Sequence, residues 1–275
     1  MNVIKSMIHA FAASALLLTL SACSFSADSR TDGAANGRED LKAGGGDIDL
    51  LDVKTPAGMP SQVKDYTGFR LGFNKENHTP NWVAWELLAS ETDGPFSRSD
   101  NFWQDEEIAG CPSTDDYKRS GFDRGHLCPA ADNKLTQEMM EDCFVMANMA
   151  PQARALNAGA WKTLESKERL WAQRDGKLYI VAGPIYEAAD TQRIGDMGVR
   201  VPSAFYKVMI ATDVDAPRGI GFIYPNMTAP GNMQNYSMTI DEVEKITGLD
   251  FFHNLPDDIE NEIESKTSFK EWNQR

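Results

Sequence analysis

The sequence predicts an α+β fold built on a mixed or antiparallel sheet. Segments that alternate aromatic or aliphatic residues with smaller ones, as strands do, occur in runs and do not alternate regularly with helices. One long segment, 157–173, has helical spacing and separates the early strand candidates from the late ones. A chain of 275 residues that is 41% hydrophobic can bury one large core or two small ones. We interpret it as one domain preceded by an N-terminal tail.

The first predicted strands are 66–73 and 82–85. The Pro80-Asn81 break between them indicates a hairpin or a meander. The polar stretches 97–100 and 104–107 predict loops.

Further along, 134–142 has helical composition, and 143–149 predicts a buried strand. The helix at 157–173 offers four apolar candidate core residues: Trp161, Leu164, Leu170 and Trp171. Three more strands and two more helices are predicted at 177–181, 204–211, 220–224, 241–247 and 256–264.

Residues 1–23 predict an export signal. Lys5 precedes an apolar run at 10–20 that is too short to stay in a bilayer as a spanning helix. The run ends in Leu-Ser-Ala-Cys23, which resembles the lipobox of bacterial lipoproteins and implies cleavage before Cys23 and a lipid on that cysteine. An ordinary signal peptide that ends near a cysteine is the alternative.

The rest of the tail predicts a tether. Residues 24–62 are rich in Ser, Gly, Ala and Asp and have no sustained apolar period. Residues 63–275 would then form the folded domain. We expect an exported protein of the bacterial cell envelope, periplasmic or on the cell surface, whose lipid anchor holds it to a membrane.

The chemistry is concentrated in Asp123-Arg124-Gly125-His126. A neutral imidazole can accept a proton from water near pH 7, and a guanidinium matches phosphate oxygens in pairs. Glycine lets backbone and substrate approach closely. A salt bridge at a turn beside a packed histidine is the alternative interpretation of these four residues.

A second segment follows downstream. Asn157, Trp161, Glu165 and Arg169 are spaced by four, so a helix would carry all of them on one face. This face begins shortly after the stretch 148–152, Asn-Met-Ala-Pro-Gln.

Together these residues resemble the DNA/RNA non-specific endonucleases of the ββα-metal type, which share the Asp-Arg-Gly-His motif. The resemblance extends from about Tyr66 to the C-terminus, with blocks at 68–74, 80–88 and 240–252 in the expected order. It implies an α+β fold with a ββα-metal catalytic motif and a long helix at the metal site. It also implies Mg²⁺-dependent cleavage of DNA and RNA that leaves 5′-phosphate ends.

The resemblance also implies roles for individual residues. His126 would be the general base, and Asn157 would bind Mg²⁺, Mn²⁺ or another divalent cation. Asn157 could also cap the helix that begins there. Glu165 would hold the waters of the metal, although a surface ion pair with Arg169 is the simpler alternative.

The remaining candidates surround the phosphate. Arg124 would neutralise charge in the transition state, and Asp123 would orient its neighbours. Four residues are expected at the substrate or in positioning it: Asn148, Gln152, Arg169 and Arg98. Arg98 is similar to an upstream arginine of the family, but it could equally be a solvated surface cation.

Net charge opposes this interpretation, because a chain with a formal charge of −14 repels a polyanion as a whole. Five cations nevertheless flank the proposed site in the sequence: Lys118, Arg119, Arg124, Lys134 and Arg154. We expect weak, salt-sensitive binding of nucleic acid.

Cys111, Cys128 and Cys143 remain after lipidation of Cys23, and three different pairs among them are conceivable. We favour a disulfide between Cys128 and Cys143, which flank the loop and helix after His126. Two functions stay open: a non-specific nuclease, and a surface lipoprotein that uses the same fold to bind nucleic acid or protein without catalysis. The sequence does not indicate an oligomeric state.

Overall fold

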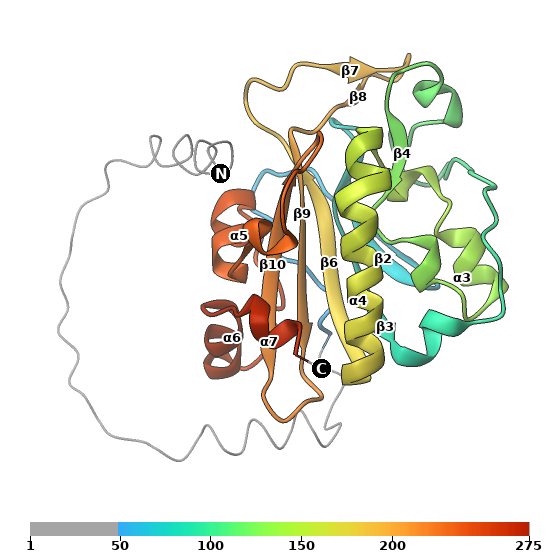
Figure 1. Ribbon diagram of the computed structural model, residues 1–275. Helices are drawn as coiled ribbons and strands as arrows, with labels where there is room; N and C mark the ends of the chain where they lie inside the picture. Colours follow the sequence, from blue (N-terminus) through green and yellow to red (C-terminus); the bar gives the residue numbers. More distant parts are fainter. Residues whose placement is uncertain (1–48, 275) are drawn as a thin grey trace, which may run out of the picture.

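The computed structural model describes residues 49–274, and its centre is a seven-stranded antiparallel sheet (Figure 1). The strand order is β1-β2-β3-β6-β9-β10-β11. The strands are β1 Gln62–Tyr66, β2 Phe69–Asn74, β3 Thr79–Leu88, β6 Lys177–Ile185, β9 Ala204–Ala211, β10 Arg218–Pro225 and β11 Ser237–Met238. This architecture confirms the predicted α+β class.

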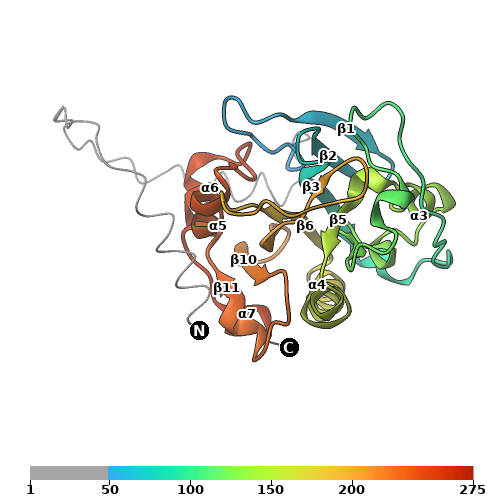
Figure 2. The same cartoon turned by 90° about the horizontal axis from the view of Figure 1, so that it is seen from above.

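Alternating side chains give the sheet two apolar faces. Along β9, Phe205 and Met209 enter one hydrophobic cluster, whereas Tyr206 and Val208 enter the other. Because both faces are covered, every residue of β9 is buried. Figure 2 shows the two covering layers on either side of the sheet.

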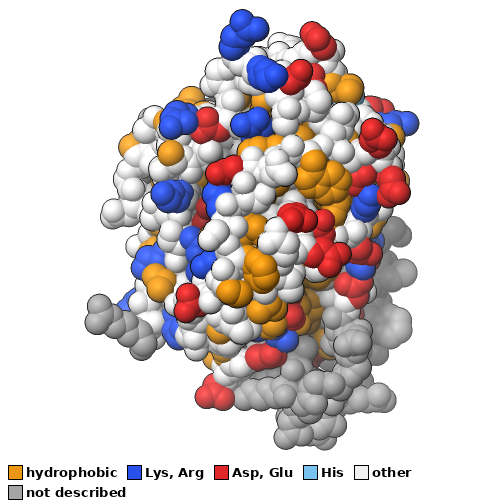
Figure 3. Space-filling model, turned by 90° about the vertical axis from the view of Figure 1, so that its right-hand side faces the viewer, with side chains coloured by type: hydrophobic (Ala, Val, Ile, Leu, Met, Phe, Trp, Pro, Cys, Tyr) orange, Lys and Arg blue, Asp and Glu red, His pale blue; other side chains and the backbone are white. Residues whose placement is uncertain are grey.

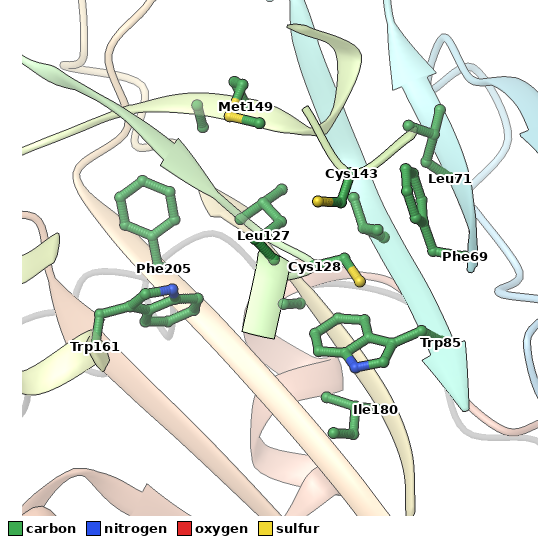
Figure 4. Close-up of a cluster of buried hydrophobic side chains, with 14 of the residues drawn as sticks. Phe69, Leu71, Trp85, Leu127, Cys128, Cys143, Met149, Trp161, Ile180 and Phe205 are labelled. Atoms are coloured by element: carbon green, nitrogen blue, oxygen red, sulfur yellow. The ribbon is translucent and has the colours of Figure 1, made fainter. Parts of the chain in front are cut away.

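The first face carries the catalytic motif and the long helix. A two-stranded ribbon of β4 Asp123–His126 and β5 Met149–Gln152 lies there, together with a π-helical turn, η5 Leu156–Trp161, and α4 Lys162–Asp175. Figure 4 shows how Trp85 of β3, Leu127 and Trp161 join Phe205 in the cluster beneath them. The short helices α3 Gln137–Asp142 and α7 Phe269–Trp272 complete this layer.

The second face is covered by α5 Ile240–Thr247 and α6 Asp257–Glu264. Residues 49–54 pack beside them: Leu50 and Val53 are buried, and Lys54 pairs with Asp250 through the backbone. The predicted domain boundary at residue 63 is therefore too late, because 49–61 belongs to the folded domain. The predicted signal 1–23, Cys23 and residues 24–48 of the predicted tether lie outside the described residues. Within 49–274, no helix combines the length and apolar composition needed to cross a bilayer.

Short elements connect the layers. They are η1 Ala89–Asp93, η2 Thr114–Tyr117, η3 Ala130–Asp132, η4 Met146–Asn148, η6 Met233–Tyr236 and the strand pair β7 Arg193–Ile194 and β8 Val199–Arg200. The strand predicted at 143–149 is wrong: this segment is buried, but it forms turns and η4 before β5 begins. Leu170 is also wrong as a core residue, because it is 54% exposed on the outer side of α4.

The predicted disulfide between Cys128 and Cys143 is not formed, and all three cysteines of the described chain are buried free thiols. Each of the two sulfur atoms has its own polar neighbour. Cys143 Sγ donates to the carbonyl oxygen of Met140 at 3.1 Å, and Cys128 Sγ accepts from Asn133 Nδ2 at 3.1 Å. The segment after His126 is therefore held by core packing and hydrogen bonds (Figure 4).

Candidate active site

The β4–β5 ribbon places the Asp-Arg-Gly-His motif at the edge of the first layer. Asp123 lies opposite Gln152 and His126 opposite Met149 in the antiparallel register. Gly125 is required here, because a Cβ atom at this position would lie 2.5 Å from the Gln152 side chain. The glycine therefore lets the two strands pair closely while His126 stays in register.

A polar cavity of about 340 Å³ opens beside the ribbon. It is lined by residues from three separate stretches of the chain: Arg98, Asp100, Phe102, Tyr117, Lys118, Phe122, Asp123, Arg124 and Asn157. The fold thus brings together four predicted site residues: Asp123 and Arg124 of the motif, Asn157 of the π-helical turn, and Arg98 of the upstream loop.

Asn157 is oriented by Asp123. Its Nδ2 donates to Asp123 Oδ2 at 2.9 Å, and only the amide nitrogen can make this bond, since an ionised carboxylate is purely an acceptor. The carbonyl oxygen Oδ1 of Asn157 is consequently left for another partner. The capping alternative is wrong: Ala155 is the N-cap of η5, and no side chain caps this helix.

His126 is buried among aromatic rings. Its ring lies against Phe144 and Phe102, with centroids 4.9 and 5.6 Å away. Burial, and then the cations of Arg98 and Arg124, lower the pKa of His126 to about 3. Its Nε2 has no hydrogen-bond partner among the residues of the described chain. The imidazole is therefore neutral at physiological pH, and its buried Nε2 is not hydrogen-bonded to any other described residue.

We expect this histidine to shape the acid stability of the protein. Its folded pKa of about 3 lies below the unfolded value of about 6.5, so the unfolded chain binds one more proton between those limits. Stability should fall as the pH falls from 6.5 towards 3, with a contribution approaching about 1.4 kcal/mol per pH unit. Urea unfolding of the wild type and of His126→Asn at pH 7, 6, 5 and 4 measures this slope. Parallel stability curves for the two proteins would show that the histidine is protonated in the fold.

Two arginines stack on the same aromatic pair. The Arg124 guanidinium lies 4.1 Å from the centroid of Phe102, and that of Arg98 lies 5.0 Å from the centroid of Phe144. Both line the cavity, where Arg98 Nε also donates to Asp100 Oδ1 at 2.6 Å and its side chain is 53% exposed. Stacking fixes the plane of each guanidinium, which prepares it for an anionic oxygen.

Glu165 and Arg169 lie on α4, one and two turns beyond the π-helical turn that carries Asn157. Burial raises the pKa of Glu165 to about 7, against the lowering effect of nearby cations, Lys207 first among them. Arg169 Nη1 donates to the buried carboxylate of Asp132 at 2.9 Å. Arg169 therefore forms its ion pair with Asp132, and not the surface pair with Glu165 that was the alternative interpretation of Glu165. Arg169 is not among the residues that line the cavity, and its expected contact with substrate stays a prediction.

Asn148 and Gln152 are completely buried, which favours the positioning role expected for them over a direct contact with substrate. Asn148 Nδ2 donates to the carbonyl oxygens of Cys128 and Cys143, both at 2.9 Å, and its Oδ1 accepts from the Cys128 amide at 3.0 Å. Asn148 therefore ties together the backbone after His126. Gln152 packs against Gly125 inside the ribbon.

Comparison with known proteins identifies the family. The DNA/RNA non-specific endonuclease family matches residues 47–258. The chain belongs to this family. A nuclease of Nostoc sp. is 35% identical over 219 residues, which is 72% of this chain and 76% of the relative. Mitochondrial endonuclease G of Bos taurus is 30% identical over 230 residues, covering 78% of this chain and 76% of its own.

A solved structure agrees with the fold. A solved structure of the EndoG/EndoGI complex, which describes the mechanism of EndoG inhibition, contains a chain with 29% identity and a TM-score of 0.66. The match covers 72% of this chain and 89% of that chain. The protein is thus a nuclease, a hydrolase with the ββα-metal architecture that its sequence resembles.

In this non-specific endonuclease, a buried ion pair attaches α4 to the sheet, and it was not predicted. Lys207 of β9 donates to both carboxylate oxygens of Glu168, at 3.1 and 2.8 Å, and both side chains are fully buried. The Lys207 ammonium also lies over the rings of Trp85 and Trp161, 5.1 and 4.8 Å from their centroids. The signal was a single lysine inside the apolar strand 204–211, where a charge needs a buried partner.

Tyr117 is a second residue whose position was not predicted. Its ring is buried at the wall of the cavity, and within residues 49–274 its hydroxyl oxygen has no hydrogen-bond partner. A phenol in this position can donate to an anionic oxygen in the cavity.

Proposed function

We propose that this nuclease hydrolyses phosphodiester bonds of DNA and RNA without sequence preference, using a divalent cation, with Mg²⁺ as the physiological ion. The observation that carries the proposal is the hydrogen bond from Asn157 Nδ2 to Asp123, which leaves an amide oxygen free at a cavity whose wall residue Phe102 contacts the ring of the neutral His126. Both groups are needed, because hydrolysis of a phosphodiester requires activation of water and neutralisation of phosphate charge.

The residues present suit a hard cation. Asn157 offers a neutral oxygen, and Glu165 on the adjoining helix offers a carboxylate whose charged form a cation would favour. Mg²⁺ keeps most of its waters and needs few protein ligands, so one amide oxygen, an outer carboxylate and the substrate phosphate form a suitable set. Mn²⁺ accepts the same oxygen ligands. When bound, the cation polarises the phosphoryl group and stabilises the departing oxygen.

The protein supplies the base. His126 accepts the proton of the attacking water, because its burial and the neighbouring arginines keep it neutral. Phe102 and Phe144 fix the plane of the ring. Arg124 and Arg98, held on the same two aromatic rings, neutralise the charge that increases on the phosphate oxygens in the transition state.

Because the net charge is −14, binding of a polyanionic nucleic acid requires a local group of cationic side chains on the surface. Figure 3 views the side of the molecule that lies to the right in Figure 1, and on it Lys and Arg side chains gather mainly along the left edge and the top. Asp and Glu side chains are more frequent on the right half of this view. We propose that nucleic acid is held weakly at the cationic margin of the cavity, so that cleavage falls steeply as the salt concentration rises.

Removal of divalent cations should abolish cleavage. We expect no nicking of supercoiled DNA and no degradation of RNA in EDTA, and full recovery when Mg²⁺ is added in excess. Asn157→Ala should lose most of the activity and should need a much higher Mg²⁺ concentration for what remains. Asn101→Ala, an exposed asparagine of the upstream loop that is not among the cavity-lining residues, serves as the control. Cleavage that persists in EDTA would contradict the proposed mechanism.

We also propose that the mature protein begins at a lipidated Cys23, which anchors the nuclease to a membrane of the bacterial cell envelope. The proposal rests on the apolar run and the Leu-Ser-Ala-Cys sequence at its end. Intact-mass analysis of the protein extracted from membranes should give a chain that starts at an acylated Cys23. A mature chain that starts elsewhere, or an unmodified Cys23, would rule out the anchor.

A further inference from the structure

A second group of carboxylates lies on the opposite face of the sheet from the candidate active site. It is formed by α5 and α6, which cover that face (Figures 1 and 2). Asp241 and Glu244 are three residues apart on α5 and therefore share one side of the helix. Glu264 ends α6. One carboxylate oxygen from each of the three residues lies within 4.8 Å of the others.

Glu264 is the buried member of the cluster, and one of its carboxylate oxygens lacks a partner in the described part of the chain. It is only 4% exposed, and its Oε1 has no hydrogen-bond partner among residues 49–274. The charges that act on it are carboxylates: besides burial, Glu244, Glu260, Asp241 and Asp250 all raise the pKa of Glu264, to about 9. An unpaired buried carboxylate is costly unless a donor or a cation compensates it.

Lys54, a cation on the same face of the sheet, is engaged elsewhere. Lys54 Nζ pairs with Asp250 at 3.0 Å, and both side chains are partly exposed. Glu244 has one oxygen fixed, because its Oε1 accepts from the backbone amide of Phe251 at 2.7 Å. Its other oxygen is free to face Asp241 and Glu264. The cluster is therefore an acidic corner that is buried at Glu264 and exposed to solvent at Asp241.

We propose that Asp241, Glu244 and Glu264 bind one Ca²⁺ ion, which fastens α5 to α6. Ca²⁺ takes six to eight oxygen ligands at about 2.3–2.6 Å in adaptable geometry, and carboxylates can bind it through one or two oxygens. Oxygens bound to one such ion lie at most about 5 Å apart, so three carboxylates with oxygens within 4.8 Å of one another are close enough to share it. Mg²⁺, with ligands at about 2.0–2.1 Å in strict octahedral geometry, fits this corner less well. Water completes the coordination on the open side.

The ion would stabilise the fold and take no part in cleavage. Residues 49–54 pack on the same layer, because Lys54 pairs with Asp250 between the two helices and Leu50 and Val53 join the second hydrophobic cluster. The bound ion would therefore stabilise the N-terminal end of the domain as well. The site is thus independent of the proposed nuclease mechanism, and its failure would leave that mechanism untouched.

Thermal unfolding tests the site. The Asn157→Ala protein is used as the parent, so that the candidate active site contributes no metal binding of its own. Ca²⁺ at about 100 times its dissociation constant should raise Tm by about 5 °C or more, whereas the same concentration of Mg²⁺ should have a smaller effect. Isothermal titration calorimetry with Ca²⁺ should give one ion per chain.

Glu264→Gln in the same parent removes the charge but keeps the shape. We expect this variant to lose the Ca²⁺-dependent rise in Tm. In EDTA it should be about as stable as the parent, because burial and the neighbouring carboxylates already favour the uncharged form of Glu264. Asp258→Asn, an exposed change on the same helix, should keep the full Ca²⁺ response. If Glu264→Gln does not fold, Asp241→Asn at the exposed side of the cluster provides the same comparison. A Ca²⁺ response that is absent from the parent, or equal in the parent and the cluster variants, would overturn the proposal.

Discussion

Replacement of His126 by Ala is expected to lower the rate of DNA and RNA cleavage by about 10²–10⁴-fold, the usual contribution of a positioned general base. The imidazole is neutral because burial and two arginines depress its pKa, and its Nε2 is not engaged by any other described residue. Initial rates on plasmid DNA and on a fluorescent RNA, at saturating Mg²⁺, measure the loss. The melting temperature of the variant should stay close to that of the wild type, since removal of the ring also removes a buried polar group.

His253→Ala provides the matched control. His253 is partly exposed and contacts Asp52 at 3.2 Å beside the second hydrophobic cluster, on the side of the sheet away from the cavity. Its loss should leave the cleavage rate within about twofold of the wild type, as expected for a surface change. Equal rates for His126→Ala and the wild type would show that another group activates the water.

The largest effect on stability is expected from Lys207→Met. The change leaves the Glu168 carboxylate buried without its cation, and breaking one side of a buried ion pair costs about 3–5 kcal/mol. The free energy of unfolding, measured with urea and followed by tryptophan fluorescence, should fall by that amount. Trp85 and Trp161, which enclose the ammonium, should report the change through a shifted emission spectrum.

The double variant Lys207→Met with Glu168→Leu separates charge from packing. Replacing both charges with apolar side chains of similar volume should restore most of the lost stability. Lys118→Met serves as the surface control, because Lys118 and its partner Asp115 are 67% and 74% exposed and their ion pair contributes little. A double variant as unstable as Lys207→Met alone would mean that the ammonium matters for reasons other than its pairing with Glu168.

Much of the sheet could be predicted from the sequence. The strand at 204–211 has the predicted bounds. A short apolar segment with Gly and Pro on its flanks is buried, and pairing in a sheet is the simplest way for its backbone N–H and C=O groups to form hydrogen bonds there. The helix that carries Glu165 was equally clear, although its first turn is π-helical and Asn157 lies within that turn. Such local departures depend on tertiary contacts, here with Asp123, and no periodicity reveals them.

The details that were missed concern partners far apart in the sequence. The segment 143–149 is as apolar as a strand, but the buried Asn148 uses its amide to bind two loop carbonyls, which favours turns over strand pairing. Cys128 and Cys143 flank the predicted loop, yet their sulfur atoms have separate polar neighbours. Helical spacing offered Glu165 as an alternative partner for Arg169, whereas the ion pair that Arg169 makes is with Asp132 of a different element. Composition and spacing do not encode these contacts, because each depends on how two elements pack.

The central claim is that the Asn157 amide oxygen binds the catalytic cation beside His126. Crystals of the protein grown with Mn²⁺ test it directly, through the anomalous difference density of the ion. We expect one Mn²⁺ within about 2.0–2.3 Å of Asn157 Oδ1, next to the His126 ring and absent from crystals of Asn157→Ala. An ion bound elsewhere in the molecule, with Asn157 directing its Nδ2 towards the cavity, would contradict the account.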